Sequence, residues 1–432
     1  MASLIAPRFV RDAAGVVVLS PSYARPAAAV VVPPVAPVSR LVKWALYLMV
    51  FSIPFELPQR QVIPVEIPTL TAAIFLLTTA LQPRLAYGRL PSPLGWFFGF
   101  LYAFVLAAAV TSTDYGSEVV HFFLLLLEGI LVFWSASNLL RNEAIARRVL
   151  ITLALSCAAL ALLSLAGVGR TAHVQFTGGE RLTVFGQNAN NTAMILAAGL
   201  VALSGLAYVL HPSWPRRRWL VWPLGAAIGW AIVGTGSRGG LLALGAGLLA
   251  FMLSGRNVWI RARNVAIGAI AIGALLWASF QSTLMRNRLE LTATSGNLAG
   301  RERIFPELLR MFQEKPLLGW GPITNKYELG LRLHEIRFPR RDAHNVVLEV
   351  LTSAGVLGAI PFLFGLGLGA LAAWRARGRL HGILPAALLA VALAANMSGN
   401  HIVSKVLWLA LAYAVAAATY PADRSRQSAR TA

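Results

Sequence analysis

Basic side chains with the chemistry to bind an anion stand at the ends of apolar segments in this chain. Arg238 lies in the turn Gly234-Thr-Gly-Ser-Arg-Gly-Gly240 between two apolar runs, where a charge is costly unless it faces water or an anion. We interpret the flanking glycines as room for a bulky ligand. Arg238 is then an anion contact rather than a side chain that only extends to the membrane surface. Arg301 begins a predicted helix, where an arginine is unfavourable unless an anion is also bound there.

His344 is the candidate general base, because its free pKa of about 6.5 lies close to neutral pH. It follows Arg337, Arg340 and Arg341 near the expected start of an apolar helix. These cations should lower the pKa of His344 and keep its imidazole neutral. Two alternatives stay open: an ordinary polar residue, or a metal ligand together with Asp342. The four aspartates of the chain lie far apart, and nucleotide-binding glycine motifs and zinc-ligand spacings are absent, so we expect no metal, nucleotide or other cofactor.

Three further charged residues carry weaker signals. Arg181, in the segment Glu180-Arg-Leu-Thr-Val-Phe-Gly186, points to an anion only in combination with other residues. Lys405 lies one turn inside the last apolar run, where it either meets a phosphate or extends to the membrane surface. Glu128 lies at the centre of an apolar run, too deep for chemistry at the outer face. We expect it to be protonated or paired with a neighbouring helix.

The elements that must position these residues are helices in a membrane. Hydrophobic residues make up 57% of the 432 residues and charged residues 13%, against about 25% charged residues in a soluble protein. The apolar runs last about 17–22 residues without alternation, which predicts spanning helices rather than barrel strands. The formal charge of +21 could indicate nucleic-acid binding. The basic residues follow the pattern of membrane-protein loops instead, so we expect no nucleic-acid partner.

We predict an all-α polytopic membrane protein with about twelve spanning helices. The expected spans are 41–57, 67–82, 94–111, 119–139, 149–166, 191–210, 219–235, 238–254, 264–280, 356–374, 382–398 and 402–420. Of the 38 basic residues, 22 fall in the terminal segments and in every second loop, five in the alternate short loops and eleven in one long loop. The positive-inside rule therefore places both termini in the cytoplasm and the long loop on the outer side.

The long outer loop divides the chain. The predicted parts are a disordered cytoplasmic tail (1–38), nine spans (39–280), the outer loop (281–343), three spans (344–420) and a cytoplasmic tail (421–432). Apolar residues recur at helical spacing from Ile304 to Phe312, which predicts an amphipathic helix from Arg301 to Gln313, lying on the membrane surface. Proline and glycine over 315–321 indicate a turn, and a second short helix is expected over 325–336.

Four short strings between about residues 180 and 360 share the predicted outer side of the membrane. In chain order they are Arg181…Phe185-Gly-Gln-Asn188-Ala-Asn190-Asn-Thr-Ala193, Ser237-Arg238-Gly239, Gly300-Arg301…Pro316-Leu-Leu-Gly319-Trp-Gly321, and His344-Asn345-Val-Val-Leu348-Glu349-Val-Leu351-Thr-Ser-Ala-Gly355-Val-Leu-Gly358. Together they resemble the O-antigen ligase and polymerase superfamily of bacterial membrane glycosyltransferases. Two positions depart from the family pattern: Ala189 replaces a usual proline, and Ser353 stands where many relatives carry an acid.

The resemblance implies a glycosyltransferase of the multi-spanning, GT-C-like type in the bacterial inner membrane, with its active site on the periplasmic side. Such an enzyme transfers a glycan from undecaprenyl diphosphate to a hydroxyl group, which in the ligase branch belongs to lipid A–core oligosaccharide and completes lipopolysaccharide. Family members are regarded as metal-independent and inverting. His344 would take the acceptor's proton or orient its hydroxyl, and Arg238 and Arg301 would neutralise the leaving diphosphate. The residues assigned to the donor diphosphate are Arg238, Arg301, Arg181, Asn190 and Lys405.

Three rival functions remain. The polymerase branch extends a lipid-linked glycan with the same donor chemistry, although the moderate chain length and compact loop favour the ligase. A protein O-oligosaccharyltransferase is disfavoured because such chains usually carry a larger soluble C-terminal part. A transporter of lipid-linked glycans belongs to another class of protein, in which inverted repeats and polar residues at the bilayer midplane are typical. This sequence shows no internal repeat, and its polar residues gather at one face.

Overall fold

The structure, a computed structural model, describes residues 9–11, 17–19, 37–55, 66–111, 114–168, 173–175, 179–182, 185, 187–208, 218–255, 257–296, 298–334, 339–399 and 401–422. Residues 1–37 and 38–432 form two compact units. In the first unit, strands β1 (Phe9–Arg11) and β2 (Val17–Leu19) pair antiparallel. The predicted disorder of the N-terminal tail concerns mainly residues outside the described ones, and so does almost all of the tail over 421–432.

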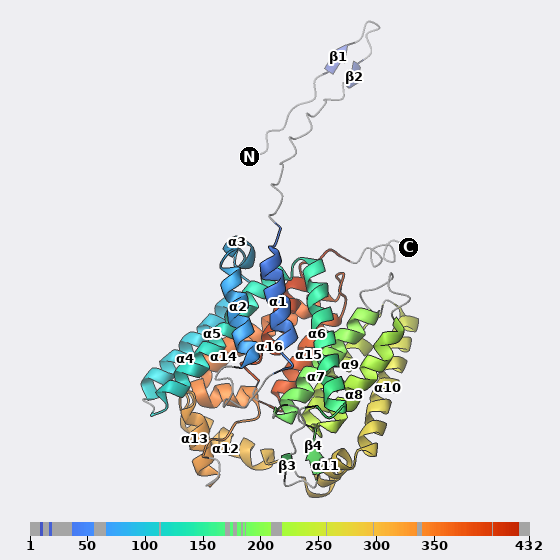
Figure 1. Ribbon diagram of the computed structural model, residues 1–432. Helices are drawn as coiled ribbons and strands as arrows, with labels where there is room; N and C mark the ends of the chain where they lie inside the picture. Colours follow the sequence, from blue (N-terminus) through green and yellow to red (C-terminus); the bar gives the residue numbers. More distant parts are fainter. Residues whose placement is uncertain are drawn as a thin grey trace. The chain divides into compact units, whose positions relative to one another are not determined.

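The second unit is built almost entirely from helices, as the sequence predicts (Figure 1). They are α1 (Arg40–Ser52), α2 (Ile67–Thr79), α3 (Pro83–Ala86), α4 (Leu94–Thr111), α5 (Gly116–Leu139), α6 (Glu143–Leu165), α7 (Ala189–Tyr208), α8 (Val221–Gly234), α9 (Arg238–Met252), α10 (Val258–Gln281), α11 (Thr283–Ser295), α12 (Arg301–Glu314), α13 (Thr324–Arg332), α14 (Val346–Ala376), α15 (Leu384–Asn396) and α16 (Lys405–Ala417). A 3-10 turn, η1 (Arg218–Leu220), precedes α8, and strands β3 (His173–Gln175) and β4 (Gly179–Arg181) form a hairpin before α7.

The described helices confirm a helical membrane protein. Six of them, α4, α5, α6, α7, α10 and α14, are long and apolar enough to cross a membrane, and α2, α8, α9, α15 and α16 are shorter apolar helices of 10–17 residues. Each of the twelve expected spans overlaps one helix, the first of them α1. Since a full crossing takes about 20 residues, helix length alone supports six spans, and the number twelve stays a prediction.

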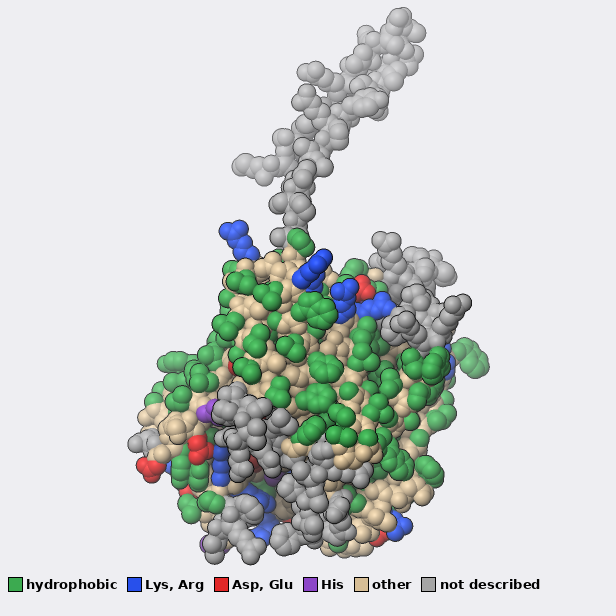
Figure 2. Space-filling view, in the orientation of Figure 1, with side chains coloured by type: hydrophobic (Ala, Val, Ile, Leu, Met, Phe, Trp, Pro, Cys, Tyr) green, Lys and Arg blue, Asp and Glu red, His purple; other side chains and the backbone are tan. Residues whose placement is uncertain are grey.

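Aromatic side chains and tight helix contacts hold the bundle together. Helix α9 packs on α15, α4 on α14, and α6 on α7. Phe97 of α4, Phe133 of α5 and Trp408 of α16 form a buried cluster in which Phe97 meets each of the other two rings edge to face. Hydrophobic side chains also cover the outer flank of the bundle (Figure 2), which is the surface that a bilayer would contact.

Helix α14 begins ten residues earlier than the sequence predicts and contains a break. Gly355 has a φ of 61° inside the helix, and a Cβ there would lie 2.2 Å from the carbonyl oxygen of Leu317. The break leaves backbone N–H and carbonyl groups of α14 without partners inside the helix, and these groups bind the turn before α13. Trp320 N–H donates to the Thr352 carbonyl (2.7 Å), and Val356 N–H donates to the Pro316 carbonyl (2.8 Å). The proline- and glycine-containing string is therefore a docking segment for the broken helix.

The outer loop is more helical and more tightly packed than the sequence predicts. The helix expected from Arg301 to Gln313 is confirmed as α12, and the second expected helix as the shorter α13. Helix α11 was not predicted. The apolar face of α12 packs on α13 and on the segment before α14, with Ile304, Leu308 and Met311 buried. The expectation that this face lies on the membrane surface is therefore wrong, because protein covers it.

Candidate functional site

The predicted site residues meet at the end of the bundle where α11, α12 and α13 lie, away from the start of α1 (Figure 1). A cavity of about 240 Å³ opens there among the beginnings of several helices. Its polar lining residues include Asn190 from the first turn of α7, Lys405 from the start of α16, and His344 and Asp342 from the segment before α14. The arginines lie behind this lining: Arg181 contacts Asn190, and Arg301 contacts Ser398, next to the lining residue Gly399.

Asn190 connects Arg181 to the start of α9. Its side-chain oxygen accepts hydrogen bonds from Arg181 Nη2 and from Ser237 Oγ, both at 2.9 Å. Ser237 in turn caps α9, since its hydroxyl accepts from the Gly240 N–H at 3.1 Å. Arg181 is buried, and its Nε also donates to the Thr235 carbonyl oxygen at 2.8 Å. Two of the four sequence strings therefore form one hydrogen-bonded unit.

Arg238 is the first residue of α9 and is held by α11. Its Nη1 donates to the carbonyl oxygen of Arg288 at 3.2 Å and to the hydroxyl of Thr292. The neighbouring glycines do not leave room for a ligand. A Cβ at Gly239 would lie 2.2 Å from Ser398 Oγ, and a Cβ at Gly240 would lie 2.3 Å from the Cβ of Ala193. The interpretation of these glycines as ligand space is wrong, because they allow α9 to approach other parts of the protein.

Arg301 is the first residue of α12 and reaches the end of α15. Gly300, with a φ of 87°, turns the chain into the helix. Arg301 Nη2 donates to the Ser398 carbonyl oxygen at 2.5 Å, and Nη1 donates to the Leu298 carbonyl oxygen at 3.2 Å. Its Nε is buried and has no hydrogen-bond partner within the described residues. Because Ser398 also contacts Gly239, the starts of α9 and α12 lie against the same short segment.

Several guanidinium groups near the cavity lower the pKa of a neighbouring arginine. Burial, followed by Arg288, Arg238 and Arg301, lowers the pKa of Arg181 to about 10. Burial and then Arg238 also lower the pKa of Arg301, although Glu302 opposes the shift. Burial, Arg238 and Arg301 lower the pKa of Arg288. A cluster in which cations lower the pKa of a neighbouring cation carries excess positive charge, which a bound anion would relieve.

His344 and Asn345 have different roles at the start of α14. Asn345 caps α14, its side-chain oxygen accepting from the N–H groups of Val347 (2.9 Å) and Leu348 (3.1 Å). His344 precedes the cap with a φ of 52°, which is uncommon for a residue other than glycine and recurs at functional sites. The Asn345 cap thus fixes the backbone that places the His344 ring at the cavity.

The imidazole of His344 is neutral at physiological pH. Burial, followed by Arg301, lowers its pKa to about 4, while Asp342 acts in the opposite direction. The direction agrees with the sequence-based expectation, but burial contributes more than the cations. Of the basic run before it, Arg337 lies outside the described residues. The described part of the chain contains no group of three histidine, cysteine, aspartate or glutamate side chains placed to hold a metal ion.

Two further residues of the site carry no sequence motif that would predict their role. His401 lines the cavity, and burial followed by His344 lowers its pKa to about 4. Its signal was only a histidine in a short outer turn between two spans. Arg288 of α11 is buried and acts on Arg181, but it was one of eleven basic residues in the loop, without a motif to single it out.

Lys405 lines the cavity but already binds a carboxylate. Its Nζ donates to Glu128 Oε2, and both side chains are buried. The expected pairing of Glu128 with a neighbouring helix is therefore confirmed, since α5 and α16 carry the two partners. Lys405 differs in this respect from Arg301, which donates to neutral carbonyl groups.

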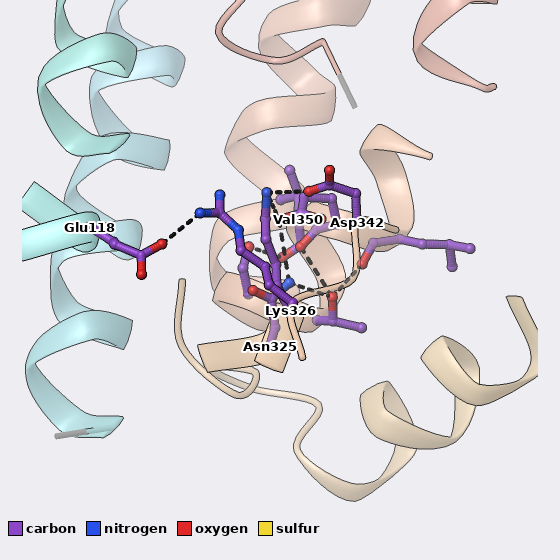
Figure 3. Close-up of polar contacts among 10 residues, drawn as sticks. Glu118, Asn325, Lys326, Asp342 and Val350 are labelled. Atoms are coloured by element: carbon purple, nitrogen blue, oxygen red, sulfur yellow. Dashed lines mark hydrogen bonds and ion pairs between the residues drawn. The ribbon is translucent and has the colours of Figure 1, made fainter. Parts of the chain in front are cut away.

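A buried polar network beside the cavity fixes the segment that carries His344. Lys326 of α13 is only 4% exposed, and its Nζ lies 2.7 Å from Asp342 Oδ1 and 3.7 Å from Glu349 Oε1 (Figure 3). Asn325 adds a hydrogen bond to Thr352 Oγ1 at 3.1 Å. Burial lowers the pKa of Lys326, but Glu349 and Asp342 outweigh it, so the pKa is raised. These pairs lock α13 onto α14 and onto the backbone just before His344.

Part of the chain is similar to a known protein family. Residues 224–363 match a family model described as O-antigen ligase. The matched segment contains Arg238, Arg288, Arg301 and His344, whereas Arg181, Asn190, His401 and Lys405 lie outside it. No curated protein matches the chain.

Proposed function

We propose that the chain, whose residues 224–363 match the O-antigen ligase family, transfers an O-antigen glycan from undecaprenyl diphosphate to a hydroxyl of lipid A–core oligosaccharide. The observation that supports this proposal is the meeting of two helix starts, each with an arginine, beside a cavity that contains a neutral histidine. A leaving diphosphate needs its charge neutralised, and an attacking hydroxyl needs a proton acceptor. The site offers both groups.

In the proposed donor complex, Arg238 and Arg301 bind the diphosphate. Their guanidinium forks suit paired phosphate oxygens, and the positive ends of α9 and α12 add to the attraction. Arg181 and Asn190 support the site by fixing Ser237 and the start of α9. Lys405 lines the same cavity and joins the donor site by exchanging its Glu128 partner for a phosphate oxygen.

The proposed reaction is a single in-line displacement. The acceptor oxygen forms a bond to the anomeric carbon while the bond from that carbon to the diphosphate oxygen breaks. The electron pair of the broken bond stays with the diphosphate, where the arginines stabilise it. Attack from the side opposite the leaving group inverts the configuration of the anomeric carbon.

His344 takes the proton of the acceptor hydroxyl in this scheme. Its imidazole is neutral before the reaction, so it is free to accept. Its low pKa also makes it a weak base in the absence of donor. A bound diphosphate would offset the positive charge of Arg301 and raise the pKa of His344 during the reaction. Donor binding thereby prepares the base for its task.

The proposed architecture completes this assignment. The site faces the periplasm of a bacterial inner membrane, both termini are cytoplasmic, and the twelve expected spans form a GT-C-like fold with the outer loop at 281–343. The alignment of each expected span with one helix supports this topology, as does the distribution of basic residues. The shorter helices among them would cross with their flanking turns.

A transfer assay tests the proposed function. The purified full-length protein in detergent with EDTA receives undecaprenyl-diphosphate-linked O-antigen and rough lipopolysaccharide, and the products are separated on a gel. We expect a ladder of lipopolysaccharide bands without added metal or ATP. Growth of the lipid-linked glycan itself would instead identify a polymerase. Absence of both products, with glycan moving across vesicles that contain the protein, would contradict the proposal and identify a transporter.

A further inference from the structure

A second cavity lies between α1 and α6, and its basic end lies at the start of α1. It has a volume of about 680 Å³ and is lined by side chains of two kinds. Arg40, Lys43 and Arg148 are basic, whereas Trp44, Leu48, Phe51 and Leu155 offer an apolar wall. None of the described residues that line it is acidic. The active-site cavity includes Ile53, just after the end of α1, so the basic residues at the start of α1 mark the opposite end of that helix.

The basic and apolar side chains are separated along the cavity. Arg148 of α6 acts electrostatically on Tyr47 of α1, and further along Ser156 of α6 donates to the Phe51 carbonyl oxygen. The two helices therefore run in the same direction, and all three cations lie toward their beginnings. Figure 2 shows hydrophobic side chains over this flank and basic side chains near the start of α1. The cavity thus has a cationic end and an apolar length.

The dimensions match one leaflet of a bilayer. From Arg40 to Phe51 the helix rises about 16 Å, at about 1.5 Å per residue, and half of a hydrocarbon core is about 15 Å thick. Trp44 and Phe51 are 70% and 43% exposed, so protein leaves their faces open along this length. The indole of Trp44 lies next to the cationic end, the depth at which tryptophan usually sits in membranes.

We propose that this cavity binds one anionic phospholipid, with its phosphate on Arg40, Lys43 and Arg148 and an acyl chain along Trp44, Leu48 and Phe51. Charge complementarity selects the headgroup, since three cations without a lining carboxylate favour a lipid with net negative charge over a zwitterionic one. The apolar wall requires the chain as well as the phosphate. By the predicted topology the site lies in the cytoplasmic leaflet, so its occupant is structural or regulatory and is separate from the glycan donor.

Native mass spectrometry of the delipidated full-length protein tests this site. We would titrate phosphatidylglycerol and phosphatidylcholine with identical acyl chains, and compare the wild type with the triple variant Arg40→Gln/Lys43→Gln/Arg148→Gln. One phosphatidylglycerol should bind tightly to the wild type. The triple variant should bind it roughly 100-fold more weakly, since each cation near a membrane surface contributes about fivefold. Inorganic phosphate should not compete, because it lacks the acyl chain.

A matched control separates the site from general surface charge. The variant Arg84→Gln/Arg375→Gln/Arg377→Gln removes three exposed basic residues predicted on the same side of the membrane but outside the cavity, and it should retain the bound lipid. Equal binding of both phospholipids, or equal loss in the two triple variants, would overturn the proposal. If the first triple variant does not fold, Arg40→Gln and Arg148→Gln singly must each weaken phosphatidylglycerol binding by about fivefold. Unchanged binding in both would also overturn it.

Discussion

Two groups of basic side chains near the outer loop differ in what they face. Arg332 of α13 lies among three carboxylates, with Glu314 at 2.6 Å, Glu328 at 2.7 Å and Glu307 at 3.2 Å. Hydrogen bonding to Glu314, and then to the other two, raises its pKa. Arg301 of α12 donates instead to two carbonyl oxygens, and burial and Arg238 lower its pKa. The pKa values of the two arginines therefore move in opposite directions.

The difference separates a structural use of charge from a functional one. Lys326, like Arg332, is held by carboxylates and joins secondary-structure elements. Near the cavity, Arg288 and Arg301 lower the pKa of Arg181, and Arg301 lowers the pKa of Arg288. Grouping like charges in a partly buried place is unfavourable for folding, and it is tolerated where a ligand of opposite charge binds. The local balance of charge, rather than the number of basic residues, indicates the site.

The largest effect is a loss of stability, expected when a basic side chain that is held by carboxylates is removed. Lys326→Met leaves Glu349 buried without its cation, and removing one partner of a buried pair costs about 3–5 kcal/mol. We expect a large fall in the thermal stability of the detergent-solubilised protein. The double variant Lys326→Met/Glu349→Leu should recover much of that loss, because neither charge is then buried alone. Equal instability of the single and double variants would show that Lys326 acts through other contacts.

The second-largest effect is a loss of turnover, expected for the arginines near the active-site cavity. Arg238→Ala removes one donor to the diphosphate, and a preorganised donor of this kind is worth about 100–1,000-fold in turnover, or about 2.7–4 kcal/mol. Transfer should fall by that factor. Arg310→Ala is a suitable comparison, because this exposed arginine pairs with Glu307 and lies away from the cavity. Near-normal transfer by Arg238→Ala would remove this residue from the site.

The pH dependence of transfer reports on His344. A protonated imidazole cannot accept the acceptor's proton, so kcat/KM for the donor should fall as pH drops through the pKa of about 4 and stay flat above about pH 5. Below the pKa the fall should approach about tenfold per pH unit. In His344→Gln this inflection should disappear together with most of the turnover. A midpoint near pH 6.5 in the wild type would mean that the base is a solvent-exposed histidine.

The smallest effect is expected for a substitution of Arg332. Its partly exposed ion pairs are each worth about 0–1 kcal/mol, so Arg332→Gln should lower thermal stability slightly and leave transfer unchanged. The measurement is the midpoint of thermal unfolding together with turnover per folded molecule. A strong loss of transfer in this variant would break the distinction between the two groups.

Much of the framework could be predicted from sequence, because each feature has a local signature. Apolar runs located the spans, and helical spacing located α12 within one residue of its end. The four strings brought Arg181, Arg238, Arg301 and His344 to one predicted face, and contacts or electrostatic interactions connect these residues in the structure.

Other features could not be predicted, because they depend on contacts between distant segments. The glycines beside Arg238 accommodate Ser398 and Ala193, which no local pattern reveals. The start of α14 was missed because the helix continues through Gly355, whose backbone break is stabilised by Pro316 and Leu317. Arg288 and His401 became recognisable only once the folded chain placed them beside the site.

Binding of undecaprenyl diphosphate to Arg301→Ala and Arg303→Ala, measured with the purified proteins in EDTA, tests the central claim most directly. The two arginines lie two residues apart on α12, but Arg303 is exposed, whereas Arg301 reaches Ser398 beside the start of α9. We predict that Arg301→Ala weakens binding by at least about tenfold, since a charge-assisted hydrogen bond is worth about 1.5–3 kcal/mol, and that Arg303→Ala binds like the wild type. Equal affinity of the two variants would contradict a diphosphate site at the starts of α9 and α12.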